Sequence, residues 1–133
     1  MYIPPGYGTV FPYMLIDRAA EFIEFLKCAF GAEELGRTVA TEGRIANCRL
    51  RIGTTSFMTS EPAGGWTEPM PGTYYIYVEN ADQTLQRALE CGATKMFDAA
   101  DMPYGDRQAG VVDPFGNIWW ISQRLRPEPY DAS

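Results

Sequence analysis

A chain of 133 residues with 46% hydrophobic and 14% aromatic residues is long enough for one small globular domain, and this composition excludes a disordered protein. The net charge of −6 argues against nucleic acid as a partner, because binding to phosphates needs a basic surface. The sequence contains no histidine, which excludes ordinary imidazole metal sites, Ser-His-Asp triads and Cys-His pairs.

The first half of the chain predicts a strand, a helix and three further strands. Pro12 places the first strand at an edge or at a bulge, because proline has no backbone donor. Asp17 is expected to cap the helix and Gly31 to end it, and the apolar residues between them recur at helical spacing. The expected elements are a strand at 9–16, a helix from 17 to about 30, and strands at about 35–40, 44–52 and 54–60.

The strand at 44–52 alternates between apolar and polar residues. Asn47, Arg49 and Arg51 face one way, and Cys48 with the other apolar residues faces the opposite way. Because the apolar face has to pack on the helix, the polar face looks into water or into a cavity. The same alternation makes Cys48 an inert core thiol rather than a nucleophile.

The second half of the chain repeats this order. A strand at 74–78 precedes a helix that Asn80 or Asp82 caps and Gly92 ends. A short strand at 95–98 and a hairpin at 104–123 follow. Within the hairpin, Asp-Pro-Phe-Gly-Asn at 113–117 is a dense turn signal.

The turn leads directly into Trp119 and Trp120. Neighbouring residues of a strand face opposite ways, so one indole enters a core and the other lines the surface across the sheet. The resemblance described below makes Trp119 the core residue and Trp120 the cavity residue.

Matching positions in the two halves are 61 to 63 residues apart, for example Gly31-Ala32 with Gly92-Ala93 and Gly53 with Gly116. Together with the shared element order, this spacing indicates two copies of one βαβββ module. We therefore expect an α+β fold in a single domain at 1–133. The first module is expected at 9–60, a Pro- and Gly-rich linker at 61–72, and the second module at 73–124.

The chain resembles the vicinal-oxygen-chelate superfamily, which includes glyoxalase I, bleomycin-resistance proteins and extradiol dioxygenases. The segments that carry the likeness are PYMLIDRAAEFIEFLKCAFGAEELGR at 12–37, GRIANCRLRIG at 43–53, YYIYVENAD at 74–82 and YGDRQAGVVDPFGNIWWIS at 104–122. The Trp pair after DPFGN is similar to the bacterial glyoxalase-like branch. The resemblance implies eight strands in an open barrel around a cavity, usually in a homodimer.

The resemblance also implies where a metal would be held. Metal-using members place their ligands on the first and last strand of each module, and these positions are here Phe11, Phe57, Thr73 and Trp120. Trp120 stands where relatives have a glutamate, and Thr73 and Asn47 stand where relatives often have a histidine. These residues are poor ligands for a divalent cation, so we expect no metal, no cofactor and no metal-dependent glyoxalase or dioxygenase chemistry.

The remaining positions combine aromatic walls with a few polar groups, which is typical of small-molecule pockets. We expect metal-independent binding of a small planar molecule, with sequestration of a drug or toxin as one form of that function. The acidic surface favours a cationic ligand, whereas Arg49 or Arg107 favours an anionic or enolate-like one. The expected ligand-binding residues are Phe11, Asn47, Arg49, Phe57, Thr73, Tyr75, Tyr104, Arg107 and Trp120.

Other interpretations of the same residues stay open. The chain could be a lyase, isomerase or dioxygenase that acts on a small oxygenated substrate with Glu61 or Asp106 as its base. It could equally be a non-catalytic interaction domain whose barrel Trp120 fills. The arginines could serve structure alone, Arg49 and Arg51 by pairing with Glu42 or Asp106, and Arg107 in an ion pair of its own.

The lengths of the apolar runs predict where in the cell the protein is located. These runs are too short to span a bilayer, and no charged segment precedes an apolar one near the start of the chain. We therefore expect a cytoplasmic protein with a small-molecule ligand and without membrane or nucleic-acid partners.

Overall fold

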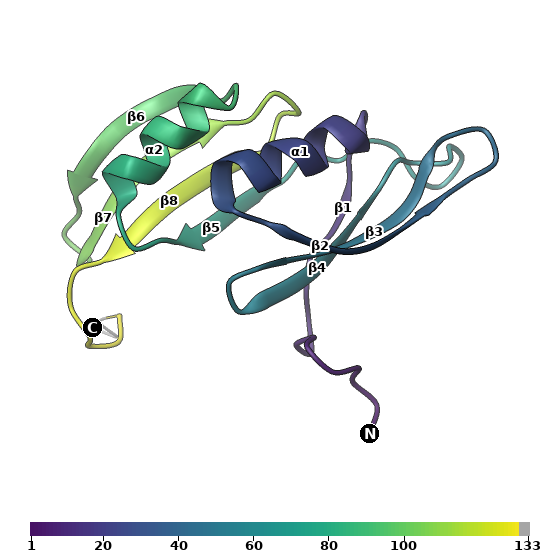
Figure 1. Ribbon diagram of the computed structural model, residues 1–133. Coiled ribbons are helices and arrows are strands. Elements are labelled where there is room, and N and C mark those ends of the chain that lie inside the picture. The colour runs from purple at the N-terminus through teal and green to yellow at the C-terminus, as the bar shows by residue number, and fades with distance from the viewer. Residues whose placement is uncertain (131–133) are drawn as a thin grey trace. The chain divides into compact units, whose positions relative to one another are not determined.

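The computed structural model of the chain describes residues 1–130 (Figure 1). The chain divides into two compact units, residues 1–71 and the residues from 72 onward. Each unit contains one helix and one four-stranded sheet in the order βαβββ, so the fold is α+β as the sequence predicts. Among residues 1–130, neither helix is long and apolar enough to cross a bilayer.

The first module is a mixed sheet with one helix. Its strand order is β1-β4-β3-β2, and β1 runs parallel to β4 while the other pairs are antiparallel. Phe22, Ile23 and Leu26 of the helix are fully buried, as are Cys48 and Leu50 of β3. The elements are β1 (Tyr13–Leu15), α1 (Ala19–Phe30), β2 (Glu33–Val39), β3 (Ile45–Ile52) and β4 (Thr55–Ser60).

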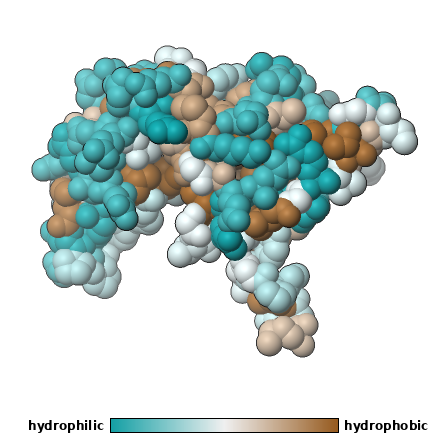
Figure 2. All heavy atoms as spheres, viewed as in Figure 1, coloured by the Kyte–Doolittle hydropathy of each residue, from teal (hydrophilic) through white to brown (hydrophobic). Residues whose placement is uncertain are grey.

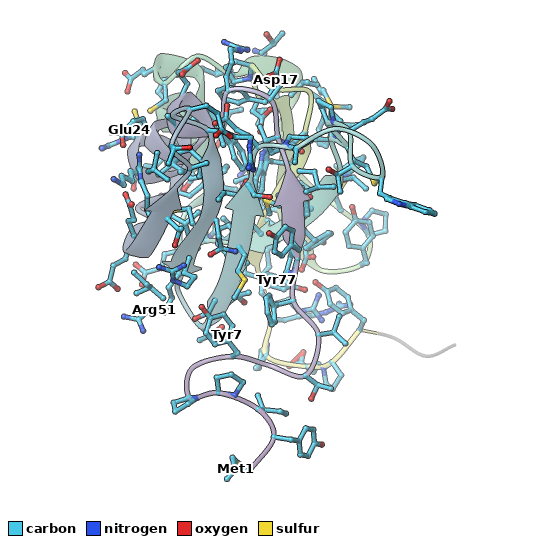
Figure 3. All side chains as sticks on the ribbon, turned by 90° about the vertical axis from the view of Figure 1, so that its right-hand side faces the viewer. Met1, Tyr7, Asp17, Glu24, Arg51 and Tyr77 are labelled. Atoms are coloured by element: carbon cyan, nitrogen blue, oxygen red, sulfur yellow. The ribbon has the colours of Figure 1, made fainter. Side chains whose placement is uncertain are left out.

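The sequence predicts the end of the first helix correctly, but not the start of the first strand or of the helix. β1 begins only after Pro12, and the chain before it is an irregular arm that runs away from the sheet to Met1 (Figure 3). The expected cap at Asp17 is wrong: the N-cap is Arg18, in the left-handed region with φ 56°, and no side chain caps the helix. The C-cap is Gly31 at φ 68°, as expected, because glycine adopts this conformation without a Cβ clash.

Glu34 of β2 joins the helix to the sheet. Its carboxylate accepts hydrogen bonds from Arg37 Nε at 2.7 Å and from Lys27 Nζ at 2.9 Å. These bonds, first that of Arg37 and then that of Lys27, lower the pKa of Glu34 to about 2. The side chain of Glu34 is only 22% exposed, so solvent screens these charges incompletely.

Glu34→Gln is expected to lower the free energy of unfolding by about 1–2 kcal/mol at pH 7, since charged hydrogen bonds are lost from a half-buried site. The folded pKa lies below the ordinary value of 4.5, so this contribution is present above pH 4.5 and disappears as the pH falls through about 2. Urea unfolding of both proteins at pH 7 and pH 2 measures it. Glu24→Gln, which removes an exposed partner of the same Lys27, should change stability by less than about 0.5 kcal/mol. A difference between wild type and Glu34→Gln that persists unchanged at pH 2 would contradict the prediction.

The second module repeats the arrangement with strand order β5-β8-β7-β6, and β5 runs parallel to β8. Asn80 is the N-cap of the helix and accepts a hydrogen bond from the backbone N–H of Gln83 at 3.0 Å. The visible surface over α2 and β6 is mostly hydrophilic (Figure 2), and Leu85 and Ala88 are buried on the inner side of the helix. The elements are β5 (Thr73–Tyr77), α2 (Ala81–Glu90), β6 (Thr94–Asp101), β7 (Asp106–Val112) and β8 (Ile118–Arg124).

The turn between β7 and β8 is built around the buried carboxylate of Asp113. One oxygen accepts from the backbone N–H groups of Phe115 at 2.9 Å and Asn117 at 3.0 Å. The other accepts from Asn117 Nδ2 at 2.9 Å and from the indole N–H of Trp119 at 2.8 Å. Asn117 Oδ1 in turn accepts from the backbone N–H of Gly72, so the turn also fixes the start of β5. This network holds Trp119 in the core, as the sequence predicts, and β8 in register.

Candidate functional site

One face of the second sheet, the face turned away from the buried Trp119, carries a row of aromatic side chains. Residues that lie directly opposite in neighbouring strands share a face, and Tyr75 is opposite Trp120, Trp120 is opposite Gly110, and Gly110 is opposite Phe97. Because Gly110 has no side chain, the Phe97 ring lies over the strand and reaches Trp120, with the ring centroids 5.9 Å apart. We call Tyr75, Phe97 and Trp120 the aromatic row.

A hydrogen bond fixes the indole of Trp120 within this row. Its N–H donates to Thr73 Oγ1 at 2.6 Å, which ties two of the sequence-predicted site residues together. The side chain is half-buried, so part of the indole surface remains open to solvent. Trp120 therefore offers a flat apolar surface whose polar edge is already satisfied.

The same face carries a buried carboxylate further along β7. Asp106 is fully buried, and one of its oxygens accepts hydrogen bonds from the hydroxyls of Tyr75 and of Tyr130, the latter at 2.6 Å. The other oxygen accepts from Arg124 Nη1 at 3.0 Å. The hydroxyls of Tyr77 and Tyr130 also share a hydrogen bond. We call Tyr75, Tyr77, Asp106, Arg124 and Tyr130 the Asp106 cluster.

The cluster keeps Asp106 ionised. Burial by itself raises the pKa of this carboxyl, but the hydrogen bonds from Tyr130, Tyr75 and Arg124 outweigh burial and hold the pKa below its ordinary value. The pKa of Tyr130 is raised, because burial and the bond to Asp106 disfavour the phenolate. At neutral pH the cluster therefore pairs one anion with one cation and keeps its phenols as donors.

The same face also carries a neutral hydrogen-bonded chain, and Tyr75 belongs both to the cluster and to the aromatic row. Tyr104 donates to Gln108 Oε1 at 2.5 Å, and Gln108 Nε2 donates to Ser122 Oγ at 2.8 Å. Gln108 and Ser122 are buried. Within residues 1–130, every buried side-chain nitrogen and oxygen has a partner, so this face is polar without being unsatisfied.

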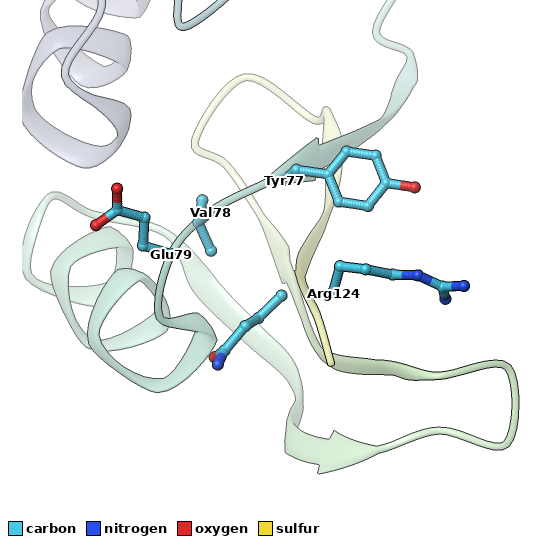
Figure 4. Close-up of a pocket in the computed structure, with 5 residues that line it drawn as sticks. Tyr77, Val78, Glu79 and Arg124 are labelled. Atoms are coloured by element: carbon cyan, nitrogen blue, oxygen red, sulfur yellow. The ribbon is translucent and has the colours of Figure 1, made fainter. Parts of the chain in front are cut away.

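An open hollow lies at the end of the sheet beside the cluster (Figure 4). Its volume is about 540 Å³, and it is lined by Tyr77, Val78, Glu79, Gln123 and Arg124. Tyr77 and Arg124 extend in the same direction from neighbouring strands, whereas Glu79 points the other way (Figure 4). The hollow is large enough for a small organic molecule that also touches the cluster.

The first module carries its own polar face, on β3 as expected. Arg49 Nη1 donates to Asn47 Oδ1 at 2.8 Å, and a Cβ on the facing Gly36 would lie 2.5 Å from the Arg49 guanidinium. Among residues 1–130, no carboxylate lies within ion-pair distance of Arg49, whereas Arg51 pairs with Glu33 and lies at the exposed end of the strand (Figure 3). Phe11, just before β1, is half-buried against Tyr7.

The structure corrects two of the predicted site residues. Phe57 is opposite Leu50 and is buried, so it belongs to the core of the first module, and Met58 takes the place next to Arg49 on the polar face. The offset that placed Phe57 on the polar face is one residue out, and a shift of one residue in a strand reverses the face. Arg107 is the second correction. It lies on the α2 side of its sheet, where Asp82 and Asp101 pair with it, so it is a structural ion pair.

The site residues that the sequence missed are Tyr77, Phe97, Gln108, Ser122, Arg124 and Tyr130. Strand alternation could have predicted two of them. Tyr77 lies two residues after Tyr75, and Arg124 lies four residues after Trp120, so each faces the same way as a residue that was predicted. No signal pointed to Tyr130, because it lies in a segment without periodicity after β8.

The residues at the family's metal positions do not fit a metal ion. Phe11 and Trp120 have no ligand atom for a divalent cation, and the Thr73 hydroxyl already accepts the Trp120 N–H. Phe57 is in the core. Within residues 1–130 there is no group of three or more Asp, Glu, Cys or His side chains that could hold a metal.

The chain is similar to known proteins both in sequence and in fold. No protein-family model matches it. It is 34% identical over 125 residues to the uncharacterized protein Mb0911c of Mycobacterium bovis, covering 86% of this chain and 82% of that protein. The crystal structure of TioX from Micromonospora sp. ML1 has a TM-score of 0.74 and 22% identity, covering 89% of this chain and all of that one. That of a glyoxalase/bleomycin resistance protein/dioxygenase family enzyme from Burkholderia phytofirmans has a TM-score of 0.68 and 16% identity, covering 86% of this chain and 97% of that one. By sequence, then, the chain belongs to the family of the mycobacterial protein, and its fold is that of the glyoxalase/bleomycin resistance protein/dioxygenase structures.

Proposed function

We propose that this protein binds a small planar organic molecule against the aromatic row of the second module, without a metal ion. One observation carries the proposal: the indole of Trp120 is held by Thr73 and flanked by Phe97, while part of its face stays open to solvent. A rigid and partly exposed aromatic surface with polar groups around it is what binds flat ligands.

The expected strength of such binding follows from stacking and burial. An aromatic pair contributes about 0.5–1.5 kcal/mol beyond the area that it buries, and each square ångström of buried apolar surface adds about 25 cal/mol. Because Trp120 and Phe97 are already ordered by their mutual contact, little side-chain entropy is lost when a ligand arrives. The row is therefore suited to affinity from shape and stacking rather than from charge.

The enzyme alternative has less support. Its main candidate base was Asp106, but the pKa of this carboxyl is lowered and all its described partners are donors that stabilise the anion. A general base that works at neutral pH needs a pKa near 7. Glu61, the other candidate, accepts the backbone N–H of Ile45 at 2.7 Å and belongs to the other module.

Sequestration of a drug or toxin is the form of this function that we favour. Resistance by binding needs a complementary surface but no catalytic group, and one structure of similar fold carries bleomycin resistance in its family description. We also expect a homodimer, which light scattering of the purified protein tests. Arg49, with its guanidinium in place and no described carboxylate beside it, is the reason to include anionic as well as cationic planar ligands in any screen.

A thermal-shift screen of planar molecules tests the proposal, because a ligand that binds only the folded state raises the melting temperature by mass action. Compounds that raise it are then titrated against Trp fluorescence in the presence and absence of a metal chelator. We expect Trp120→Ala to weaken their binding about tenfold or more, the loss of one stacking surface, with no effect of the chelator.

Trp66→Phe is the matched control. Trp66 is fully exposed in the first unit, so its replacement removes one background fluorophore and should leave affinity unchanged. A ligand that binds Trp120→Ala as tightly as wild type, or that binds only with a stoichiometric divalent metal, would overturn the proposal.

A further inference from the structure

Tyr130 contacts the rest of the Asp106 cluster in the way that a small aromatic ligand would. Its hydroxyl donates to Asp106 Oδ2 at 2.6 Å and shares a hydrogen bond with the hydroxyl of Tyr77. Its ring lies under the guanidinium of Arg124, 4.2 Å from the ring centroid. Three separate features therefore recognise one phenol: an anionic acceptor, a neutral hydroxyl and a cation over the ring face.

The chain that carries Tyr130 is tied down at few points. Residues 125–130 lie outside the sheet, and Pro127 and Pro129 lack the N–H that a further strand would need. Leu125 donates its backbone N–H to Gly105, and Arg124 Nη2 donates to the carbonyl of Glu128 at 2.5 Å. Tyr130 itself remains 45% exposed. Such a segment opens at low cost, because it buries little apolar surface.

We propose that Tyr75, Tyr77, Asp106 and Arg124 form a binding site for the phenolic ring of a ligand, and that Tyr130 is an internal competitor for this site. The inference rests on the proposed function, since it names the chemical class of the planar ligand. It adds that residues 125–130 close over the site when no ligand is present.

The charges of the site select a phenol over other aromatic groups. The carboxylate of Asp106 is fully buried and accepts donors, so an aromatic carboxylate would be repelled, and a plain hydrocarbon ring would not replace the hydrogen bond that Tyr130 donates to it. A neutral phenol supplies one donor and a ring for Arg124. The hollow of about 540 Å³, which Tyr77 and Arg124 also line, leaves room for the rest of the ligand (Figure 4).

The effect of Tyr130 on ligand affinity depends on the fraction of molecules in which Tyr130 occupies the site. Apparent affinity is reduced by the fraction of molecules whose site is open. If Tyr130 fills the site in about 90–99% of molecules, its removal makes binding of a phenol about 10–100-fold tighter.

The test is calorimetric titration of wild type, Tyr130→Ala and Tyr130→Phe with p-cresol, the side chain of tyrosine, and with toluene, which has the same shape without the hydroxyl. We expect p-cresol to bind Tyr130→Ala about 10–100-fold more tightly than wild type. Tyr130→Phe, which keeps the ring and loses the hydroxyl, should lie between them. Tyr77→Phe added to Tyr130→Ala should reduce the preference for p-cresol over toluene.

Two results would overturn the inference: equal p-cresol affinity in wild type and both Tyr130 variants, or no preference for p-cresol over toluene in the open variants. These results are separate from failure of the proposed function. If planar ligands depend on Trp120 for binding but bind the Tyr130 variants as they bind wild type, only the inference about Tyr130 is contradicted. Absence of any Trp120-dependent binding would instead count against the proposed function, whatever p-cresol does.

Discussion

Asp113→Ala is expected to destabilise the second module by about 3–5 kcal/mol, a large part of the 5–15 kcal/mol that holds a domain of this size folded. The carboxylate is almost fully buried and accepts hydrogen bonds from two backbone N–H groups, the Asn117 amide and the Trp119 indole. Alanine removes the carboxylate from all these donors, and Asn117 and Trp119 are too deeply buried to bond to water in its place. Urea unfolding followed by Trp fluorescence measures the loss.

Asp113→Asn separates the hydrogen bonds from the shape of the side chain. The amide keeps one acceptor oxygen, but its NH₂ group then faces two donors, so we expect a smaller loss of about 2–3 kcal/mol. Asp101→Ala is the control, because Asp101 is exposed and its partner Arg107 keeps a second carboxylate in Asp82. Its effect should stay within about 0.5 kcal/mol. If Asp113→Ala costs no more than this control, the turn is not organised by its carboxylate.

Alternation along the sequence predicted which side chains share a face of a sheet wherever the strand itself was predicted correctly. In β3 the alternating residues put Asn47, Arg49 and Arg51 opposite the core, and in β8 they separated Trp119 from Trp120. The turn residues at 113–117 marked the hairpin that joins β7 and β8, because Pro, Gly and Asn have few conformations in common with strands. These features are local, and local patterns are what a sequence displays.

The predictions were wrong where tertiary structure determines the position of a side chain. Phe57 was assigned by an offset from relatives, and an offset carries no information on strand parity. Arg107 was included among the ligand-binding residues as a charged donor, with a structural ion pair as the alternative. Neighbours in a strand point to opposite faces, so Arg107 points away from the face of Asp106 and pairs with Asp82 of α2. Asp17 was expected to cap α1, but the chain enters the helix through Arg18 in a left-handed conformation.

The Asp106 cluster could not be predicted at all as a unit. Its members come from β5, β7, β8 and the segment after β8, and only the register of the three strands brings Tyr75, Asp106 and Arg124 together. Tyr130 is 24 residues from Asp106 in the chain and belongs to no periodic element. A cluster of this kind becomes visible only when strand pairing is known.

Asp106→Ala is expected to have an effect as large as Asp113→Ala, about 3–5 kcal/mol, for a different reason. Removing one member of a buried ion pair leaves the other charge uncompensated. Arg124 is 21% exposed and would keep the carbonyl oxygens of Tyr104 and Glu128 but no anion, while Tyr75 and Tyr130 would lose the carboxylate as acceptor. Asp98→Ala, which breaks an exposed pair with Lys95 in the same module, should cost less than about 0.5 kcal/mol.

The pH dependence of Asp106→Asn identifies the charge as the cause. The folded pKa of Asp106 lies below its ordinary value of 3.8, so the ionised carboxylate stabilises the fold above that pH, and this stabilisation is lost as the pH falls through the lower folded pKa. The difference in unfolding free energy between wild type and Asp106→Asn should therefore be largest at pH 7 and shrink below about pH 4. A difference that stays constant down to pH 2 would mean that Asp106 acts through its shape and its neutral hydrogen bonds. In that case the cluster would favour a phenol through a neutral hydrogen bond and not through the charge of Asp106.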